Sequence, residues 1–563
     1  MSNPMPDNSP AQTADEVRAR SVQIPVTDNI IPPHAYDISK HRLSDKQRVF
    51  IRQFSGVKLE TLQERNPGLL VFPDCLGIHQ DKIENEELFH LSWDGNKLFT
   101  GNIVGFFGIG SVHFQIRSRF DKNEAGKSQF FLHHMLSRVF CGSMLNLPTH
   151  PDEEPIWDFL IYLFPFALKR AVRQGLFRTY RTFHRNDDHL RGAIDIPRHI
   201  RYNIPFNGKV AYRTREYSGN NHLNHLIRHT IELLRRHPVC SRLLVADTDF
   251  RSAVRSIVEL TPDFNPQDAA RVIAKNLRPI RHPFYTEYTL LQSICLKILR
   301  HERITYGLAD DELTGIVFKA EWLWEEYLAS VLADSPIKHS HNITRQSPEK
   351  ITIYESGKKE VFPDFFSDKI VMDAKYKRSD DLQRYDRFQL ISYIHIRRAE
   401  LGLLLYPADK SLSEMKIVYE DEEEGRLNGG GSLGCVFFSI PQNASHFDEF
   451  QSAIAESEKK LNELIGKALQ MDKVKLDGNE LDAITFATQH TKILVIRTAR
   501  GMLGCGYISA DTAAKVGDAL AIVSGVANYD DMLQAAVKAV SPAAEALGVH
   551  PGMTGRDALL KML

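Results

Sequence analysis

The chain has 563 residues, of which 43% are hydrophobic and 25% are charged. This length exceeds what one hydrophobic core usually supports, so we expect a globular protein of three or four domains. The formal net charge of −1 excludes a uniformly basic or acidic protein, and the absence of an apolar run of about 18 residues argues against a membrane span.

The cysteines and the N-terminal residues indicate the compartment. The N-terminal residues are polar and lack the apolar core of a signal peptide, and we expect a disordered or extended arm over residues 1–45. A reducing cytoplasm is the expected location, because the six cysteines are scattered and form no C-x-x-C pair that would suggest a zinc site or a disulfide framework.

Residues 46–145 are predicted to form a β-rich domain. Apolar runs at 69–72 and 102–108 are separated by turn signals, and residues 112–117 alternate as in a half-buried strand. Helical periodicity follows at 128–140. The sequence therefore predicts a small twisted sheet or barrel that ends in a helix.

Residues 146–314 are predicted to form a basic domain of short strands and helices. Helices are expected over 156–174 and 221–236, with short strands between 180 and 215, including one at 190–196. Between Lys169 and Arg242, 16 Lys or Arg residues stand against five acids, a net charge of +11. This block indicates a polyanion or an acidic partner surface, although a solvated basic face is the alternative.

The most specific pattern lies in residues 361–377. Asp364 follows a proline, and after a turn and an apolar run come Asp373, Ala374 and Lys375. Two strands that meet at a tight turn would bring these side chains to one edge of a sheet. Carboxylate oxygens suit Mg²⁺, and a lysine can orient a water against a phosphodiester. This is the PD-(D/E)xK nuclease pattern, and a β-hairpin with a surface salt bridge is the alternative.

The segments that flank the motif match the element order of such a nuclease. A β-rich run begins at Ile351, and a helix over 384–398 places Gln389 and Tyr393 on one face. A continuous apolar run at 401–406 is typical of a buried strand. We therefore predict a nuclease domain in this region.

The predicted nuclease domain spans residues 315–442. An amphipathic helix over 320–332 places Glu325 where it could add a carboxylate to the site. Directly after the motif, Lys377 and Arg378 are expected to contact DNA phosphates, which position DNA without reading its sequence.

The last part of the chain changes in composition. Residues 443–471 are predicted to form a helical linker, and residues 472–563, rich in Ala, Gly and Val, an α/β module. Within the module we expect a strand at 493–496 and a helix at 529–544. Overall, the sequence predicts a multidomain α/β and α+β protein.

Several segments form an ordered series along the chain. They are Asn102-Ile-Val-Gly-Phe-Phe-Gly108, Val112-His-Phe-Gln-Ile-Arg-Ser-Arg-Phe120, Leu190-Arg-Gly-Ala-Ile-Asp-Ile196, Leu323-Trp-Glu-Glu-Tyr-Leu328, the nuclease motif and Gln389-Leu-Ile-Ser-Tyr393. This series resembles the McrC family, the nuclease subunit of modification-dependent restriction systems. It departs from the usual family pattern where Ser118-Arg119-Phe120 stands for Pro-Lys-Phe.

The resemblance implies a DNA endonuclease of a 5-methylcytosine-type restriction or anti-phage complex, which acts with an McrB-like AAA+ GTPase. It also implies that the N-terminal β domain docks on the partner ring and stimulates nucleotide hydrolysis. The sequence agrees with this division, because it contains no G-x-x-x-x-G-K-[ST] loop to bind nucleotide phosphates.

Together, motif and resemblance assign expected roles. Mg²⁺ is held by Asp364, Asp373 and the Ala374 carbonyl, with Glu325 completing the outer site. Lys375 positions the attacking water and offsets charge on the phosphoryl oxygens. Gln389 and Tyr393 are expected to orient Lys375 or the scissile phosphate. The alternative is that these two side chains only pack the helix.

The C-terminal module resembles the YunC-type domain of unknown function. The likeness rests on Leu503-Gly-Cys-Gly-Tyr-Ile508, Ala521-Ile-Val-Ser-Gly-Val526 and Gly548-Val-His-Pro-Gly-Met-Thr-Gly555. Two alternatives remain open for the whole chain. One is a non-catalytic adaptor that activates an AAA+ ring, and the other is a stand-alone DNA repair nuclease.

Overall fold

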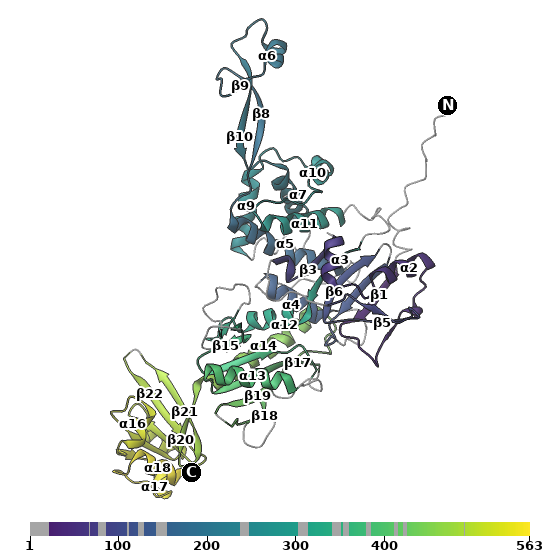
Figure 1. The fold of residues 1–563 in the computed structure, drawn as a ribbon. Helices are drawn as coiled ribbons and strands as arrows, with labels where there is room; N and C mark the ends of the chain where they lie inside the picture. The colour runs from purple at the N-terminus through teal and green to yellow at the C-terminus, as the bar shows by residue number, and fades with distance from the viewer. Residues whose placement is uncertain are drawn as a thin grey trace.

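The structure is a computed structural model. In chain order it contains an N-terminal sheet, a helical lobe, a central sheet and a C-terminal unit (Figure 1). It is a mixed α/β multidomain protein. None of the described helices is long and apolar enough to cross a membrane. The structure describes residues 22–66, 68–76, 86–109, 112–121, 129–141, 155–236, 247–301, 313–340, 351–352, 360–378, 384–409, 415–419, 425–428, 430–488 and 490–563.

The N-terminal sheet has the strand order β1-β7-β6-β11-β3. Its alternating strand β7 buries every second residue, as the sequence pattern predicts. A small sheet and the two helices α2 and α3 pack around the same core. The bounds are β1 Val22–Thr27, β2 Tyr36–Asp37, α2 Asp45–Phe54, α3 Leu59–Arg65, β3 Leu69–Phe72, β4 His90–Leu91, β5 Lys97–Phe99, β6 Ile103–Ile109, β7 Val112–Arg117 and β11 Leu313–Lys319.

Two features of this sheet differ from the sequence prediction. Strand β1 lies within the predicted arm, because its apolar residues Ile24 and Val26 are buried against the sheet. Strand β11 lies mostly within the predicted nuclease domain, yet it pairs with β6 and β3. Gly315 permits this close approach, since a Cβ there would lie 2.3 Å from the Phe106 carbonyl oxygen.

The helical lobe shares one continuous core with the central sheet. The predicted helices near 128–140, 156–174 and 221–236 are confirmed as α4, α5 and α7, with small shifts at their ends. The bounds are α4 Phe130–Cys141, α5 Pro155–Gln174, α7 His222–Arg236, α9 Thr248–Leu260, α10 Ala269–Lys275 and α11 Glu287–His301.

A β-ribbon arm projects from the helical lobe (Figure 1). Strands β8 (Thr179–Asp187) and β10 (Val210–Ser218) pair antiparallel along their whole length. The strand expected at 190–196 is only β9 (Ala193–Ile194), because the Asp195 side chain caps the helix α6 (Ile196–Asn203). The arm therefore ends in a short helix.

The central sheet has the strand order β12-β15-β16-β17-β19-β18, with β16, β17 and β19 parallel. Alternate residues of its strands belong to two different cores: α12 and α14 pack on one face and α13 on the other. Strands β13 and β14 pair separately. The bounds are α12 Ala320–Val331, β12 Lys338–His339, β13 Ile351–Thr352, β14 Glu360–Val361, β15 Phe365–Phe366, β16 Ile370–Ala374, α13 Arg384–Arg397, β17 Leu401–Ala408, β18 Ile417–Tyr419, β19 Ser432–Ser439 and α14 Phe447–Gln470.

Helix α14 occupies the predicted linker but is part of the central core. Its side chains at helical spacing, including Phe450, Ile454, Leu461 and Ile465, are buried against α12, α4 and the sheet. The helix passes directly into the first strand of the C-terminal unit. The C-terminal unit is therefore attached through an element that the central core holds.

The C-terminal unit has its own core and a six-stranded sheet in the order β20-β21-β22-β23-β24-β25. The single helix expected at 529–544 is wrong, because α16 ends at Gln534 and Pro542 starts a second helix after β25. The bounds are β20 Met471–Leu476, β21 Asn479–Ala487, β22 Lys492–Arg497, β23 Met502–Cys505, α15 Ala510–Val516, β24 Leu520–Val523, α16 Tyr529–Gln534, β25 Ala539–Val540, α17 Pro542–Ala546 and α18 Gly555–Met562.

Candidate active site

The structure brings the acidic motif residues together at the β15–β16 hairpin. Phe365 faces Met372 in the antiparallel register, so one further step along the hairpin sets Asp364 opposite Asp373. The Ala374 backbone N–H donates a hydrogen bond of 2.7 Å to Asp364 Oδ2. The hairpin expected from the sequence thus fixes both carboxylates at one position on the sheet.

Lys375 connects this hairpin to helix α13. Its Nζ lies 2.5 Å from Asp373 Oδ2 and donates to Gln389 Oε1 at 3.1 Å. Gln389 Nε2 donates to the Tyr393 hydroxyl at 3.1 Å, and that hydroxyl donates to the Phe362 carbonyl at 3.2 Å. The expected pair on one helix face therefore orients Lys375 and ties α13 to the segment between β14 and β15, which carries Asp364.

Glu325 reaches the same region from α12. Its Oε1 lies 2.8 Å from His339 Nε2, and the His339 ring stacks on Phe365 with centroids 5.0 Å apart. The charge of Glu325 also acts on Asp364. The carboxylate predicted from sequence spacing is therefore close to the motif, and a histidine holds it.

Burial and mutual repulsion dominate the electrostatics of the carboxylates. Burial, followed by the charges of Glu325 and Asp373, raises the pKa of Asp364 well above its ordinary value. Burial also raises the pKa of Asp373, against the opposing effect of Lys375. The arrangement thus concentrates negative charge that a cation can relieve.

Lys375 stays protonated in this setting. Burial alone lowers its pKa, but the ion pair with Asp373 and the charges of Asp364 and Asp386 outweigh burial, and the pKa rises above its ordinary value. At neutral pH the side chain is an ammonium, which can donate hydrogen bonds and offset negative charge but cannot accept a proton. Burial likewise raises the pKa of Tyr393 to about 12, so this hydroxyl is neutral.

The donor set fits Mg²⁺ better than a softer metal. The side chains that converge here are carboxylates, and Mg²⁺ typically uses one or two carboxylates, with waters and substrate phosphates in its remaining positions. In the described part of the chain, no group of three or more His, Cys, Asp or Glu side chains is arranged to hold a metal on its own. Asp373, which is buried, and Asp364, which is partly buried, are the oxygen donors that would hold the ion.

The two expected DNA contacts have partners within the protein. Lys377 Nζ lies 3.0 Å from Asp386 Oδ1, and Arg378 donates to the Arg119 carbonyl at 3.5 Å. The Arg378 side chain is exposed, and Lys377 is partly exposed. Both lie directly after the hairpin.

Sequence reasoning missed His339 and Asp386. Asp386 is buried on α13 one turn before Gln389, and it faces both Lys375, at 3.9 Å, and Lys377. Its position at i−3 from Gln389 was a usable signal, because residues three apart share a helix face. His339 follows no motif, and only the pairing of β12 with β15 brings it to the site.

Comparison with known families shows to which family the chain belongs. Residues 98–407 match the family of McrBC 5-methylcytosine restriction system components. The chain belongs to this family. The match covers more than half of the chain and confirms the resemblance to McrC that the motif series indicated.

The C-terminal unit has relatives of its own. Residues 504–562 match a domain of unknown function, DUF1805. The uncharacterized protein YunC of Bacillus subtilis (strain 168) is 29% identical over 99 residues, which are 17% of this chain and 98% of YunC. A crystal structure of a Thermoplasma acidophilum protein of unknown function, TA1206, is 32% identical with a TM-score of 0.16, covering 17% of this chain and 92% of that one. The YunC-like C-terminal domain is thus confirmed.

Two solved structures from Thermococcus gammatolerans are also similar. One is a half-complex of McrB AAA+ hexamers with bound McrC, at 16% identity and a TM-score of 0.43, covering 79% of this chain and 100% of that one. The other is the McrBC complex, at 14% identity and a TM-score of 0.28, covering 56% of this chain and 88% of that one.

Proposed function

We propose that the chain is the Mg²⁺-dependent DNA endonuclease subunit of a modification-dependent restriction complex in the cytoplasm. The observation that supports this proposal most is the convergence of Asp364, Asp373 and Lys375 on one hairpin, with Gln389 bonded to the lysine. Asp373 is buried and Asp364 and Lys375 are partly buried, and removing such a group of charges from water costs free energy, which points to a purpose beyond packing. A PD-(D/E)xK core gives them that purpose.

Each residue contributes a separate step in this proposal. Asp364 and Asp373 hold the ion, which when bound polarises the scissile phosphate and its attacking water. The Lys375 ammonium donates to the attacking water and offsets charge that develops on the phosphoryl oxygens. Gln389, backed by Tyr393, keeps that ammonium aimed at the reaction, and Glu325 lies on the outer side of the carboxylate pair.

The β-ribbon arm, formed by β8, β9, α6 and β10, has a surface that suits contact with a partner protein. Its tip exposes large apolar side chains among basic residues, and it projects away from the candidate active site (Figure 1). In the described part of residues 46–145, the domain first expected to dock, the exposed large apolar side chains are Val49 and Trp93. We therefore propose that the arm, in place of the N-terminal β domain, engages an AAA+ GTPase partner. The exposed apolar residues of the tip are Leu190, Ile194, Ile196, Ile200, Tyr202, Ile204 and Phe206.

The basic block itself gives weaker support for DNA binding. Several of its cations pair with acids that lie beyond the block in sequence: Lys169 with Asp247 at 2.6 Å and Arg170 with Glu287 at 2.6 Å. These ion pairs neutralise part of the counted charge.

Cleavage of 5-methylcytosine-containing plasmid DNA by the purified chain, its AAA+ partner, GTP and Mg²⁺ tests the proposal. Asp373→Asn or Lys375→Met should reduce the cleavage rate at least about 100-fold and leave stimulation of the partner's GTPase unchanged. Asp368→Asn is the matched control, because Asp368 is exposed in the same hairpin turn. Cleavage that survives Asp373→Asn would show that the site lies elsewhere.

The same assay separates the competing functions. A non-catalytic adaptor would stimulate GTP hydrolysis but leave DNA intact with every variant. A stand-alone repair nuclease would cut without partner or GTP, with binding that weakens steeply with salt. For the arm, Ile200→Asp should abolish GTPase stimulation and Val49→Asp should not, since both side chains are exposed but only Ile200 belongs to the tip.

A further inference from the structure

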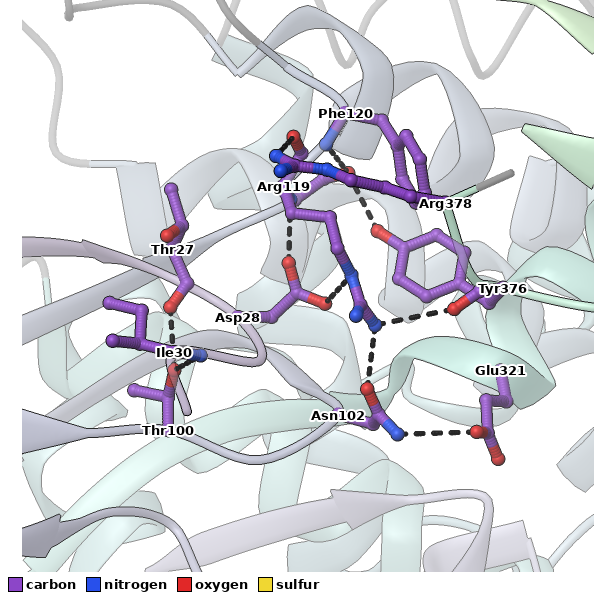
Figure 2. Close-up of polar contacts among 11 residues, drawn as sticks. Thr27, Asp28, Ile30, Thr100, Asn102, Arg119, Phe120, Glu321, Tyr376 and Arg378 are labelled. Atoms are coloured by element: carbon purple, nitrogen blue, oxygen red, sulfur yellow. Dashed lines mark hydrogen bonds and ion pairs between the residues drawn. The ribbon is translucent and has the colours of Figure 1, made fainter. Parts of the chain in front are cut away.

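A buried polar network joins the N-terminal sheet to the segment that directly follows Lys375 (Figure 2). Its centre is Arg119, just beyond β7, whose side chain is 7% exposed. The Arg119 Nε lies 3.0 Å from Asp28 Oδ2, and the Arg119 backbone N–H donates to Asp28 Oδ1 at 2.5 Å. Asp28 is fully buried and follows β1. The arginine is thus fixed from the N-terminal side.

From this fixed position Arg119 holds the chain beyond the hairpin. Its Nη2 donates to the Tyr376 carbonyl at 3.3 Å, and its guanidinium stands 5.0 Å from the centre of the Tyr376 ring. Ser118 and the Tyr376 hydroxyl are 2.6 Å apart, and Arg378 donates to the Arg119 carbonyl. The residue next to Lys375 is therefore held at its backbone, its ring and its hydroxyl.

The same arginine also reaches the start of helix α12. Its Nη2 donates to Asn102 Oδ1 at 2.6 Å, and Asn102 Nδ2 donates to Glu321 Oε1 at 3.2 Å. The Asn102 carbonyl accepts the Ala320 backbone N–H at 2.8 Å. Helix α12 carries Glu325 one turn later. The residue that follows Lys375 and the start of the helix that carries Glu325 are therefore both held by the Arg119 side chain.

We infer that Arg119 is a positioning residue of the nuclease site, which sets the backbone after Lys375 and the start of α12 relative to each other. The inference rests on the proposed nuclease function for its catalytic consequence. A buried ion pair adds little net stability, so stability alone does not explain this network. Geometry does, because displacement of a reacting group by about 1 Å can cost roughly 100-fold in rate.

Three variants separate positioning from general stability. Arg119→Met combined with Asp28→Asn removes the hold on Tyr376 and avoids leaving a buried carboxylate unpaired. Arg119→Lys keeps the charge beside Asp28 and has three donors for the same acceptors. The structural control is Thr100→Val, which removes hydrogen bonds to Thr27 and from Ile30 at the same junction but touches neither Tyr376 nor Asn102 (Figure 2).

Hydrogen exchange of the full chain is the first readout, since it requires no activity. The double variant should exchange the amides of residues 374–378 at least about tenfold faster than Thr100→Val does, and Arg119→Lys should restore most of the protection. Equal exchange in the double variant and the control would overturn the inference. If the double variant does not fold, Asn102→Ala takes its place, because it removes the side-chain link from Arg119 to the start of α12 and keeps the ion pair with Asp28. Exchange of residues 320–325 in Asn102→Ala that is no faster than in Thr100→Val would then overturn the inference.

Cleavage kinetics with partner, GTP and Mg²⁺ are the second readout. The double variant should lower kcat about 10- to 100-fold and raise the Mg²⁺ concentration for half-maximal rate, with the KM for DNA within about twofold. A parallel rise in KM with unchanged kcat would refute positioning. If the wild-type chain does not cut at all, the proposed function fails, while the exchange data still decide whether Arg119 positions this segment.

Discussion

Glu458 tests whether α14 is a structural part of the central core. Its carboxylate accepts from the Tyr327 hydroxyl at 2.8 Å, lies 2.8 Å from His134 Nε2, and is 3.4 Å from Arg138 Nη2. Burial opposes ionisation, yet bonds to His134, Arg138 and Tyr327 outweigh it, and the pKa of Glu458 is lowered. The group therefore joins α14, α12 and α4 as a buried anion.

Replacing Glu458 with alanine should destabilise the central core by about 3–5 kcal/mol. The Tyr327 hydroxyl and the His134 ring would lose their acceptor in a buried site, at roughly 1–3 kcal/mol for each unsatisfied group, and Arg138 would lose its charge partner. A change of this size lowers the midpoint of thermal unfolding by about 10 °C in a unit of roughly 200 residues. The matched control is Glu456→Ala, which removes only an exposed pair with Lys460, 3.6 Å apart, worth at most about 0.5 kcal/mol.

Tryptophan fluorescence follows this transition, because Trp324 packs against Tyr327 with ring centroids 5.7 Å apart. Acid should remove the same stabilisation. Because the pKa of Glu458 is lowered in the folded state, its contribution is complete above the ordinary pKa of a glutamate and is lost as the pH falls through the folded-state pKa. Equal melting shifts for Glu458→Ala and Glu456→Ala would refute the reasoning and return α14 to the role of a linker.

Further variants test the site and the packing. Asp364→Asn should abolish cleavage but raise the melting temperature in the absence of Mg²⁺. The reason is that the pKa of the Asp364 carboxyl is raised in the folded state, so its ionisation destabilises the fold as the pH rises. Mg²⁺ at a concentration of 100 Kd should stabilise the wild-type chain by about 2.7 kcal/mol and this variant far less, which calorimetry would detect. Gly315→Ala should melt several degrees lower, since its Cβ would meet the backbone of Phe106 and Phe107. Gly466→Ala in α14 should add about 0.5–1 kcal/mol, because nothing lies within 4 Å of the added Cβ; a loss of stability there would contradict the helix assignment.

The candidate site was predictable where its signals are local. A turn between two apolar runs set Asp364 and Asp373 on one hairpin, and helical spacing set Gln389 and Tyr393 on one face. These relations span at most a few turns of chain, so period and turn chemistry suffice. The expected contact between Gln389 and Lys375 is present in the structure, because a helix that follows a strand packs back on the same sheet.

The rest depends on contacts between distant parts of the sequence. Nothing near Arg119 in sequence indicates that it will hold Tyr376, 257 residues later. The amphipathic pattern of α14 shows that one face is buried but not against which element. The arm likewise reads as ordinary alternating strands, and only the structure shows that its apolar tip stays exposed.

The position of β11 constrains how the chain folds during synthesis. Strand β11 lies between β6 and β3, so the N-terminal sheet is complete only after residue 319 has left the ribosome. Until then β6, an apolar strand of the sheet interior, has an unpaired edge of the kind that promotes aggregation. The nascent chain must shield this edge while the whole helical lobe is translated. Expression of the first 145 residues alone should therefore give an insoluble fragment.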